Sequence, residues 1–234
     1  MKQVKMTKLP VYSFETAEAI NQLRVNLSFT DQDCRAVVVT SSLPDEGKSF
    51  VSVALWRALS EVGKKTLLID CDLRLSKLME RYGIIAETPL IGVSHVLSGQ
   101  NDWQDAVYET DVINGCIMPV TSIVTNPSIL LESRRLGRMI EEAKKQFDLI
   151  LIDTPPIISV ADALTVCKNA DASIMTVRSG KTKKSVVKDC IKRLQMTGKP
   201  VLGVVLNRVD TGNHHYGYYY YGYRNNPYIS EEKK

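Results

Sequence analysis

The chain has 234 residues, of which 44% are hydrophobic and 24% charged, the composition of an ordinary soluble globular protein. This length suits one α/β domain with its own core plus appendages. The net charge of +4 is too small to indicate a nucleic-acid partner, and no uninterrupted apolar run is long enough to cross a bilayer.

The cysteines and the N-terminus favour a cytoplasmic location. The five cysteines are scattered without a C-x-x-C pair, so reduced thiols are favoured over a disulfide framework or a zinc site. The first residues are not followed by the apolar segment of a secretory signal.

The first element in chain order is a helix in an N-terminal arm. Residues 1–13 show no periodicity, whereas residues 15–29 carry apolar side chains at helical spacing. This arm, residues 1–30, precedes the first strand and lies outside a minimal nucleotide-binding fold. It is either packed on the domain or in contact with a neighbouring subunit.

A strand, a loop and a helix follow the arm. Residues 36–40 are an apolar, β-branched run that predicts a buried strand, and residues 50–62 have helical spacing. The loop between them ends in Gly47, Lys48 and Ser49. This context indicates a phosphate-binding P-loop, in which consecutive backbone amides and the helix N-terminus face the phosphates.

The residues of this loop have predicted roles. Gly47 lets the backbone approach the phosphates, Lys48 would reach the β- and γ-phosphates, and the Ser49 hydroxyl would ligate Mg²⁺. The loop departs from the pattern G-x-x-x-x-G-K-[ST] at one position, because Ser42 stands where the first glycine is usual.

Two further strands are predicted to end in carboxylates. Residues 66–70 end in Asp70, with Asp72 just beyond, and residues 148–153 end in Asp153 before two prolines. The carboxyl ends of strands are where α/β sheets bind ligands. The later strand has the Walker B form, which delivers an aspartate to the Mg²⁺ side of the phosphates.

The remaining segments complete an α/β fold. A helix is expected from its start at residues 126–128 to about residue 147, and strands are expected at residues 172–177 and 201–206. Since strands alternate with helices, we expect a P-loop domain over residues 31–210. Its sheet should be mostly parallel, with helices on both faces.

Residues 211–234 differ in composition from the rest of the chain. They have little aliphatic content and no periodicity, which predicts a flexible tail that joins no core. Few cations accompany the aromatic residues, which argues against stacking on nucleic-acid bases. A dense tyrosine block on a phosphate-handling domain indicates phosphoryl acceptors. The candidate acceptors are Tyr216, Tyr218, Tyr219, Tyr220, Tyr221, Tyr223 and Tyr228.

Together these segments resemble the bacterial tyrosine kinases of capsular and exopolysaccharide synthesis (BY-kinases). The closer resemblance is to the Gram-positive type, in which a cytoplasmic kinase is separate from its membrane activator. The matching segments are the Walker A loop at 42–49, the D-x-D-x-R Walker A′ segment at 70–74, the N-P-S helix start at 126–128, the Walker B segment at 152–156 and the terminal tyrosine cluster.

The resemblance implies an ATP-dependent protein-tyrosine autokinase that uses ATP and Mg²⁺. Lys48 and the loop amides would hold ATP, while Ser49 and Asp153 would hold Mg²⁺ directly or through water. Asp70 or Asp72 would be the base that activates the tyrosine hydroxyl, and the other would help to hold the metal, with Asp70 placed nearer to it by the resemblance. The expected nucleotide-binding residues are Pro44, Asp45, Glu46, Gly47, Lys48, Ser49, Phe50 and Asn207, the last as an adenine contact.

The resemblance also implies assembly. In the family the N-terminal helix often carries E-x-x-R-x-x-R, which helps to build a ring of subunits; here Glu18 and Arg24 match, but Asn21 replaces the first arginine. The expected partners are further copies of the chain, the cytoplasmic tail of a transmembrane polysaccharide co-polymerase that acts as activator, and a cognate phosphotyrosine phosphatase. The kinase would lie in the cytoplasm at the inner face of the membrane. Phosphorylation of its tail would open the ring and modulate polysaccharide polymerisation and export.

The alternative class is that of the related partition and septum-site ATPases, which have no kinase activity. These proteins carry a second lysine five residues before the lysine of the Gly-Lys pair, and Leu43 occupies that position here. They also lack a tyrosine-rich tail.

Overall fold

The structure, a computed structural model, describes residues 2–31 and 33–210. The tyrosine-rich segment 211–234 lies outside the described residues, and with it the predicted flexibility of the tail and the candidate phosphoryl acceptors. In the described part of the chain, no helix combines the length and the apolar character needed to cross a membrane.

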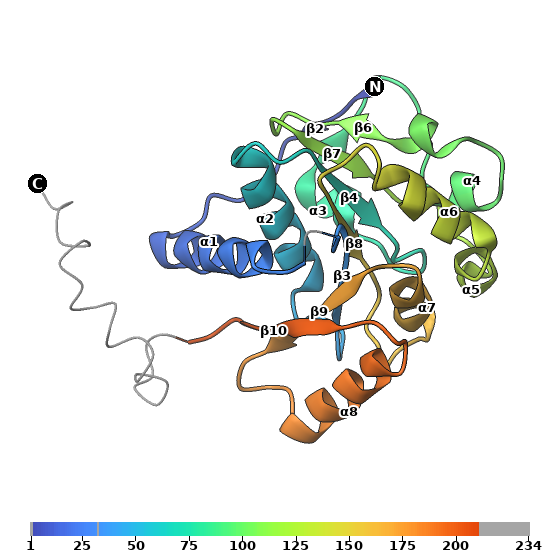
Figure 1. The fold of residues 1–234 in the computed structure, drawn as a ribbon. Helices are drawn as coiled ribbons and strands as arrows, with labels where there is room; N and C mark the ends of the chain where they lie inside the picture. Colours follow the sequence, from blue (N-terminus) through green and yellow to red (C-terminus); the bar gives the residue numbers. More distant parts are fainter. Residues whose placement is uncertain (1, 32, 211–234) are drawn as a thin grey trace, which may run out of the picture.

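An eight-stranded sheet forms the centre of the described part of the chain (Figure 1). Neighbouring strands run parallel except for the pair β6–β7. The mostly parallel sheet predicted from the sequence is therefore confirmed. In spatial order the strands are β1 (Lys2–Gln3), β6 (Tyr108–Glu109), β7 (Gly115–Met118), β4 (Thr66–Asp70), β8 (Leu149–Asp153), β3 (Ala36–Ser41), β9 (Ala172–Arg178) and β10 (Val201–Asn207).

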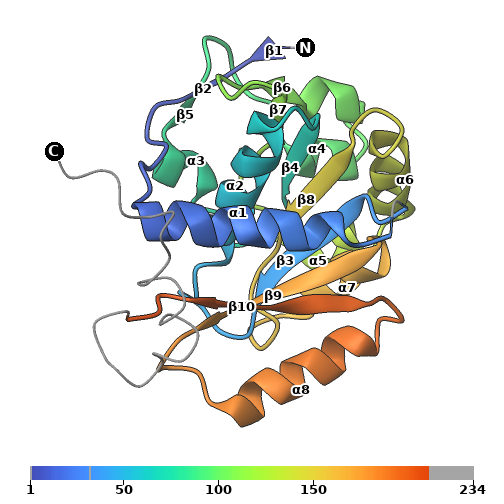
Figure 2. The same ribbon diagram turned by 60° about the vertical axis from the view of Figure 1, so that its left-hand side comes forward.

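Helices cover both faces of this sheet, as predicted, and their two layers can be followed in Figures 1 and 2. One face is covered by α1 (Phe14–Ser28), α2 (Lys48–Glu61) and α3 (Leu78–Tyr82). The other face is covered by α4 (Val93–Leu97), the 3₁₀ helix η1 (Trp103–Ala106), α5 (Pro127–Leu131), α6 (Arg134–Ala143), α7 (Asp162–Lys168) and α8 (Lys184–Gln195).

The central strands alternate their side chains between two cores. In β3, Val37 and Val39 pack with α2, whereas Ala36 and Val38 pack on the opposite side with α7 and its neighbours. All four side chains are fully buried. Strands that are covered on both faces need an apolar residue at every position, which is why this strand was a continuous apolar run in the sequence.

The predicted helix from residues 126–128 to about residue 147 is two helices. The chain turns at Glu132 and Ser133, where Ser133 is extended (φ −65°, ψ 146°) and α6 begins. The turn lets Leu131 of α5 and Leu136 of α6 reach the same core, and both are fully buried. Helical spacing persists across such a turn, so the break was not visible in the sequence.

Residues 1–13, for which no regular structure was predicted, contribute two short strands. β1 pairs with β6 at the edge of the main sheet, and β2 (Lys5–Met6) pairs with β5 (Ile84–Ile85) in a separate two-stranded sheet. Strands of two residues are too short to produce a recognisable alternation.

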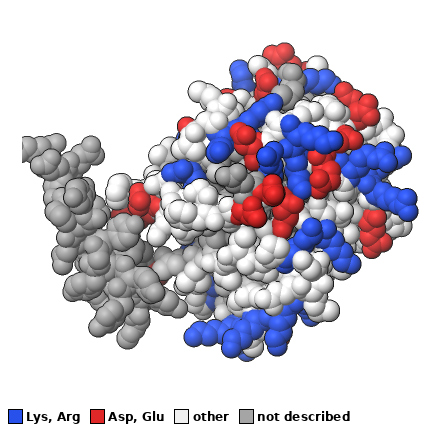
Figure 3. All heavy atoms as spheres, in the orientation of Figure 1, with Lys and Arg blue, Asp and Glu red and all other residues white. Residues whose placement is uncertain are grey.

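The basic residues near the start of the last helix are exposed. Figure 3 shows Lys and Arg side chains in a row along the lower edge of the molecule, where Figure 1 places α8. Lys184, Lys188 and Lys192 of this helix are all exposed. Much of the small positive charge of the chain is therefore solvated on this helix.

The packing of Gly115 generates a stability prediction. Gly115 faces the buried Trp56, and a Cβ at this position would lie 2.5 Å from Cζ2 of the indole. We expect Gly115→Ala to lower the free energy of unfolding by about 1–3 kcal/mol, measured by chemical denaturation, because the core must open to admit the methyl group. Gly203→Ala is the control, since a Cβ at Gly203 meets no atom within 4 Å. Equal losses in the two variants would contradict this packing argument.

Candidate functional site

The site forms where three adjacent strands, β4, β8 and β3, end at the same edge of the sheet. The parallel register pairs Asp70 of β4 directly with Asp153 of β8. The P-loop follows β3, the next strand, and leads into α2. Segments that are more than a hundred residues apart in the chain are thereby brought to one edge.

The P-loop backbone has the strained conformation that a phosphate-binding turn requires. Gly47 has φ +93°, a left-handed conformation that favours glycine, and Asp45 also has positive φ (62°). A Cβ on Gly47 would lie 1.9 Å from Nδ2 of Asn207, whose amide donates to the carbonyl of Glu46 (2.9 Å). Thus Asn207, predicted as an adenine contact, lies directly against the loop and holds its backbone.

Glu46 holds the loop from within. Its buried carboxylate accepts hydrogen bonds from the amide (2.7 Å) and hydroxyl (2.7 Å) of Ser42 and from the amide of Leu43 (2.9 Å), and it also bonds the Thr182 hydroxyl. Glu46 was predicted as a nucleotide-binding residue, and its carboxylate is directed at the loop itself. Ser42, the departure from the P-loop pattern, thus supplies two of the donors that close the turn.

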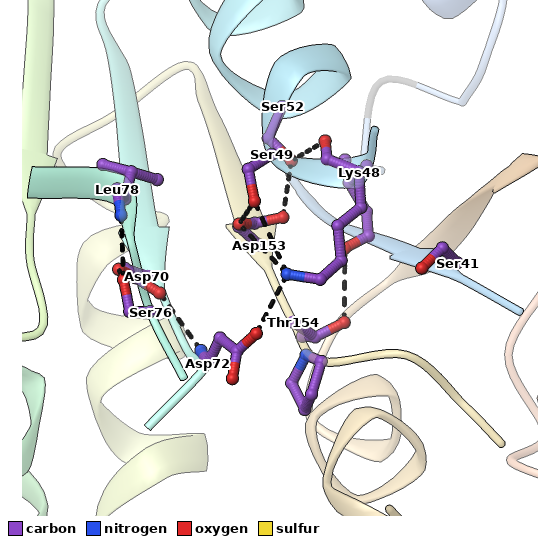
Figure 4. A network of polar contacts seen from close by, with 12 residues as sticks. Ser41, Lys48, Ser49, Ser52, Asp70, Asp72, Ser76, Leu78, Asp153 and Thr154 are labelled. Atoms are coloured by element: carbon purple, nitrogen blue, oxygen red, sulfur yellow. Dashed lines mark hydrogen bonds and ion pairs between the residues drawn. The ribbon is translucent and has the colours of Figure 1, made fainter. Parts of the chain in front are cut away.

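Four side chains from three elements converge on Lys48, as the close view in Figure 4 shows. The Lys48 ammonium lies 3.0 Å from Oδ2 of Asp72 and 3.8 Å from Oδ2 of Asp153. The Ser49 hydroxyl donates to Asp153 Oδ2 (2.6 Å), and the Ser52 hydroxyl donates to Asp153 Oδ1 (3.0 Å). Four residues predicted as catalytic or metal-binding therefore meet here, and Ser52, one turn after Lys48, is an additional member that the P-loop pattern does not include.

Asp70 lies deeper than the other predicted carboxylates. It is fully buried, and its carboxylate accepts hydrogen bonds from the Ser76 hydroxyl and from the backbone amide of Asp72 (3.1 Å). Asp72 is 6% exposed and lines a cavity of about 330 Å³ together with Lys48 and Ser49. The two carboxylates that the sequence did not distinguish therefore differ in their access to this cavity.

Burial and crowding of charge shift the pKa values of this cluster. Loss of solvation, and to a smaller extent repulsion from Asp153, raises the pKa of Asp70 to about 7. Burial also raises the pKa of Asp153, against the opposing effect of the Lys48 ammonium. Burial acts to lower the pKa of Lys48, but the Asp153 and Asp72 carboxylates outweigh it and raise that pKa. The ammonium is thus held charged by the carboxylates around it.

The other predicted nucleotide-binding residues lie at the loop with different orientations. Pro44 and Asp45 line the cavity. The ring of Phe50 packs edge-on against Tyr12, with ring centroids 5.7 Å apart.

The predicted oligomer contacts lie on α1, apart from this cluster. Arg24 donates to Oδ1 of Asn21 through Nη2 (2.6 Å) and Nε (3.2 Å). The residue that replaces the first arginine of the ring motif is therefore bonded to the second, while Glu18 is half-buried on the same helix.

The oxygen donors of the cluster fit Mg²⁺. A hydroxyl and carboxylates are hard oxygen ligands, and Mg²⁺ keeps several waters, so that one or two protein ligands suffice. Ser49 and Asp153, already within hydrogen-bonding distance of one another, would hold the ion beside the phosphates, with Asp70 next to them.

Comparison with known proteins identifies the family. The AAA domain family model matches residues 43–201. The tyrosine-protein kinase CpsD of Streptococcus agalactiae is 34% identical over 205 residues, which are 88% of this chain and 89% of that protein. The chain belongs to the bacterial tyrosine-protein kinases. The family predicted from the sequence motifs is therefore confirmed, and the protein is a P-loop protein-tyrosine kinase.

Solved structures place the kinase fold within a wider group. The kinase domain of VpsO matches with a TM-score of 0.76 at 31% identity, over 84% of this chain and 95% of that one. The septum site-determining protein MinD of Pyrococcus horikoshii, complexed with Mg-ADP, matches with a TM-score of 0.64 at 29% identity, over 74% of this chain and 70% of that one. The fold is thus shared with the class considered as the alternative, and the likeness to the kinases extends over more of the chain.

The raised pKa of Asp70 generates a pH prediction for the metal-free kinase. Because the folded pKa lies above the unfolded value of about 3.9, the native state retains a proton that the unfolded chain releases, and stability falls as the pH rises from about 4 to about 7. In EDTA at pH 8, Asp70→Asn should therefore be more stable than the wild type, by on the order of 4 kcal/mol, and the difference should shrink towards pH 5.

Thermal melts across this pH range test the prediction, and Asp171→Asn supplies a control of opposite sign. Burial acts to raise the pKa of Asp171, but hydrogen bonds from Lys144 and from the amides of Ala36 and Arg35 outweigh it and lower that pKa. Removing this charge should destabilise the kinase at pH 8. An Asp70→Asn variant that melts at a lower temperature than the wild type at pH 8 would contradict the prediction that the buried charge destabilises the fold.

Proposed function

We propose that this kinase uses MgATP to phosphorylate the tyrosines of its own C-terminal segment, and that it thereby regulates capsular or exopolysaccharide polymerisation and export. The convergence of Lys48, Ser49, Asp72 and Asp153 on one cavity of a tyrosine-kinase fold is the observation that carries the proposal. The acceptors are the seven tyrosines from Tyr216 to Tyr228 named above.

The P-loop residues bind and orient the nucleotide in this proposal. The loop amides behind Gly47 and the Lys48 ammonium neutralise the β- and γ-phosphates, and Asn207 lies beside the loop at the end of β10 as the adenine contact. Mg²⁺, when bound, neutralises charge that develops on the phosphates. Ser49 and Asp153 orient the ion, and Ser52 fixes the second oxygen of Asp153.

Asp72 is the base in this proposal, with Asp70 on the metal side. Asp72 lines the cavity, whereas Asp70 is fully buried and bonded to Ser76. Asp72 takes the proton from the tyrosine hydroxyl. The tyrosine oxygen bonds to the γ-phosphorus as the bond between that phosphorus and the leaving oxygen of ADP breaks. Lys48 now pairs with Asp72, and when Lys48 turns to the phosphates it leaves a carboxylate oxygen free to accept that proton.

Replacement of the two aspartates separates their roles. Asp72→Asn should slow tyrosine phosphorylation by roughly 10²-fold or more and leave the affinity for nucleotide within about tenfold, because a base acts in transfer and not in binding. Rates from phosphotyrosine labelling and affinities from titration of a fluorescent ATP analogue provide the comparison. Asp72 would not be the base if Asp72→Asn lowered nucleotide affinity and phosphorylation rate equally. The same would follow if Asp70→Asn lowered the rate and Asp72→Asn did not.

The acceptor tyrosines come from a neighbouring subunit in this proposal. An unphosphorylated tail enters the adjacent site and closes a ring, with Glu18 and Arg24 of helix α1 at the subunit contact. Phosphorylation adds roughly −1.5 to −2 charges per tyrosine and expels the tail from a site that already holds phosphates. The activator tail and a phosphotyrosine phosphatase would set the balance at the inner face of the membrane.

A mixing experiment tests both the activity and its direction. One chain carries Lys48→Met and an intact tail; the other is active but has the seven tail tyrosines replaced by phenylalanine. With MgATP and the activator's cytoplasmic peptide, the Lys48→Met chain should become phosphorylated on its tail, measured by intact mass, because its tyrosines can enter the active site of its partner.

The outcomes of this experiment are distinct. The Lys48→Met chain by itself should not label, because the ammonium that neutralises the phosphates is gone. Lys188→Met, at an exposed position of α8, is the control that should label normally. If wild-type chains label but the Lys48→Met chain in the mixture does not, transfer between subunits is contradicted. Formation of ADP without phosphotyrosine in any mixture would contradict the autokinase and favour a partition-type ATPase.

A further inference from the structure

Two motif residues have no part in the mechanism so far. Arg74 ends the D-x-D-x-R segment after β4, and Ser128 ends the N-P-S segment at the start of α5. In the fold they meet at a third residue, Asp162, at the start of α7, which the sequence did not single out.

The three side chains form a closed hydrogen-bonded group. Arg74 donates to Asp162 through Nε (2.7 Å) and Nη2 (3.2 Å), and its Nη2 also donates to the Ser128 hydroxyl (2.9 Å). The Ser128 hydroxyl in turn donates to Oδ1 of Asp162 (2.9 Å). The turn after β4, which lines the cavity, is thus tied to α5 and α7 at one carboxylate.

Burial makes this group rigid. The Asp162 side chain is 1% exposed, and an unpaired carboxylate at that depth would be costly, so the pair with Arg74 is retained. The planar guanidinium reaches both carboxylate oxygens at once, which fixes its direction as well as its position. Arg74 is 37% exposed and lines the same cavity as Asp72.

The fixed arginine belongs to the turn that carries Asp72. Within this turn the amide of Leu75 donates to Oδ1 of Asp72 (3.1 Å), and the amide of Ser76 donates to the Asp72 carbonyl (3.0 Å). Lys48 pairs with the remaining oxygen, Oδ2. The turn sets where the Asp72 carboxylate points, and Arg74, in the middle of the turn, is anchored to α5 and α7.

We propose that Ser128 and Asp162, acting through Arg74, are positioning residues for Asp72. They hold the turn of residues 72–76 so that the Asp72 carboxylate faces the cavity where the tyrosine enters. The inference rests on the proposed role of Asp72 as base. It also gives the N-P-S segment a function, since the Ser128 hydroxyl joins the turn to α5 and does not cap its own helix.

Ser128 is the member of the group to replace first. Ser128→Ala removes one hydroxyl and leaves the Arg74–Asp162 pair intact, so no buried charge is stranded. Ser128→Thr keeps the hydroxyl and is the conservative rescue. Ser185→Ala on exposed α8 is a matched control that removes a serine hydroxyl outside the cavity.

Steady-state kinetics of tyrosine phosphorylation by the full chain, with MgATP and the activator peptide, provide the test. Ser128→Ala should lower kcat about tenfold, with KM for ATP within about twofold and the melting temperature within about 2 °C of wild type. Ser128→Thr and Ser185→Ala should stay within about twofold of wild type in kcat. Arg74→Lys, which keeps the charge but loses the two-pronged contact, should lose more than Ser128→Ala does.

A double variant shows whether the effect passes through Asp72. If it does, Ser128→Ala should lower the residual rate of Asp72→Asn by less than about twofold, because the carboxylate it positions is already gone. A further tenfold loss in that background would mean that Ser128 acts elsewhere and would overturn the proposal.

The remaining outcomes also decide. Unchanged kcat in Ser128→Ala overturns the proposal even if Arg74→Lys fails to fold, and a rise in KM for ATP at unchanged kcat assigns the group to nucleotide binding instead. If the wild type labels and Asp72→Asn is fully active, the base assignment fails and the inference fails with it. If wild type labels, Asp72→Asn is impaired and Ser128→Ala is normal, only the inference fails.

Discussion

The site depends on an imbalance of charge at the carboxyl edge of the sheet. Three carboxylates, of Asp70, Asp72 and Asp153, lie around the ammonium of Lys48 in a largely buried cluster. Burial makes that excess of negative charge unfavourable, and the pKa of Asp70 rises to about 7 as a result. A hard cation is the natural compensation, and phosphates bring one with them. The metal–nucleotide complex proposed as the ligand would supply such a cation.

The strand register enforces this crowding. Asp70 and Asp153 are paired residues of neighbouring parallel strands, so their side chains lie on the same side of the sheet at the same level. A slip of one residue would turn one carboxylate to the other face and separate the pair. The side chains on both faces of these strands pack into two cores, and this packing holds the register. The hydrophobic core therefore stabilises an arrangement of charges that would not form by itself.

The two sides of the cavity have different supports. On the P-loop side, the Glu46 carboxylate holds the loop from within through the amides of Ser42 and Leu43, and Asn207 of β10 holds the Glu46 carbonyl. On the opposite side, Arg74 and Asp162 join the turn after β4 to α7. Because a P-loop fold is shared with the septum-site protein MinD, the activity has to be argued from these side chains and not from the fold.

The sequence by itself determined the fold class and the three strand ends that carry the chemistry. Two of these strands are continuous apolar runs that end in Asp70 and Asp153, and the third is a run followed by the loop up to Ser49. Such patterns involve neighbouring residues only, so they can be recognised in the sequence without the fold. The sequence did not distinguish Asp70 from Asp72, because burial depends on what packs over the strand end. Nor did it find Ser52, Ser76, Thr182 or Asp162, which are ordinary residues until folding brings them to a carboxylate or a guanidinium. The break between α5 and α6 was likewise decided by tertiary packing, since Leu131 and Leu136 share one core across a turn that leaves helical spacing unchanged.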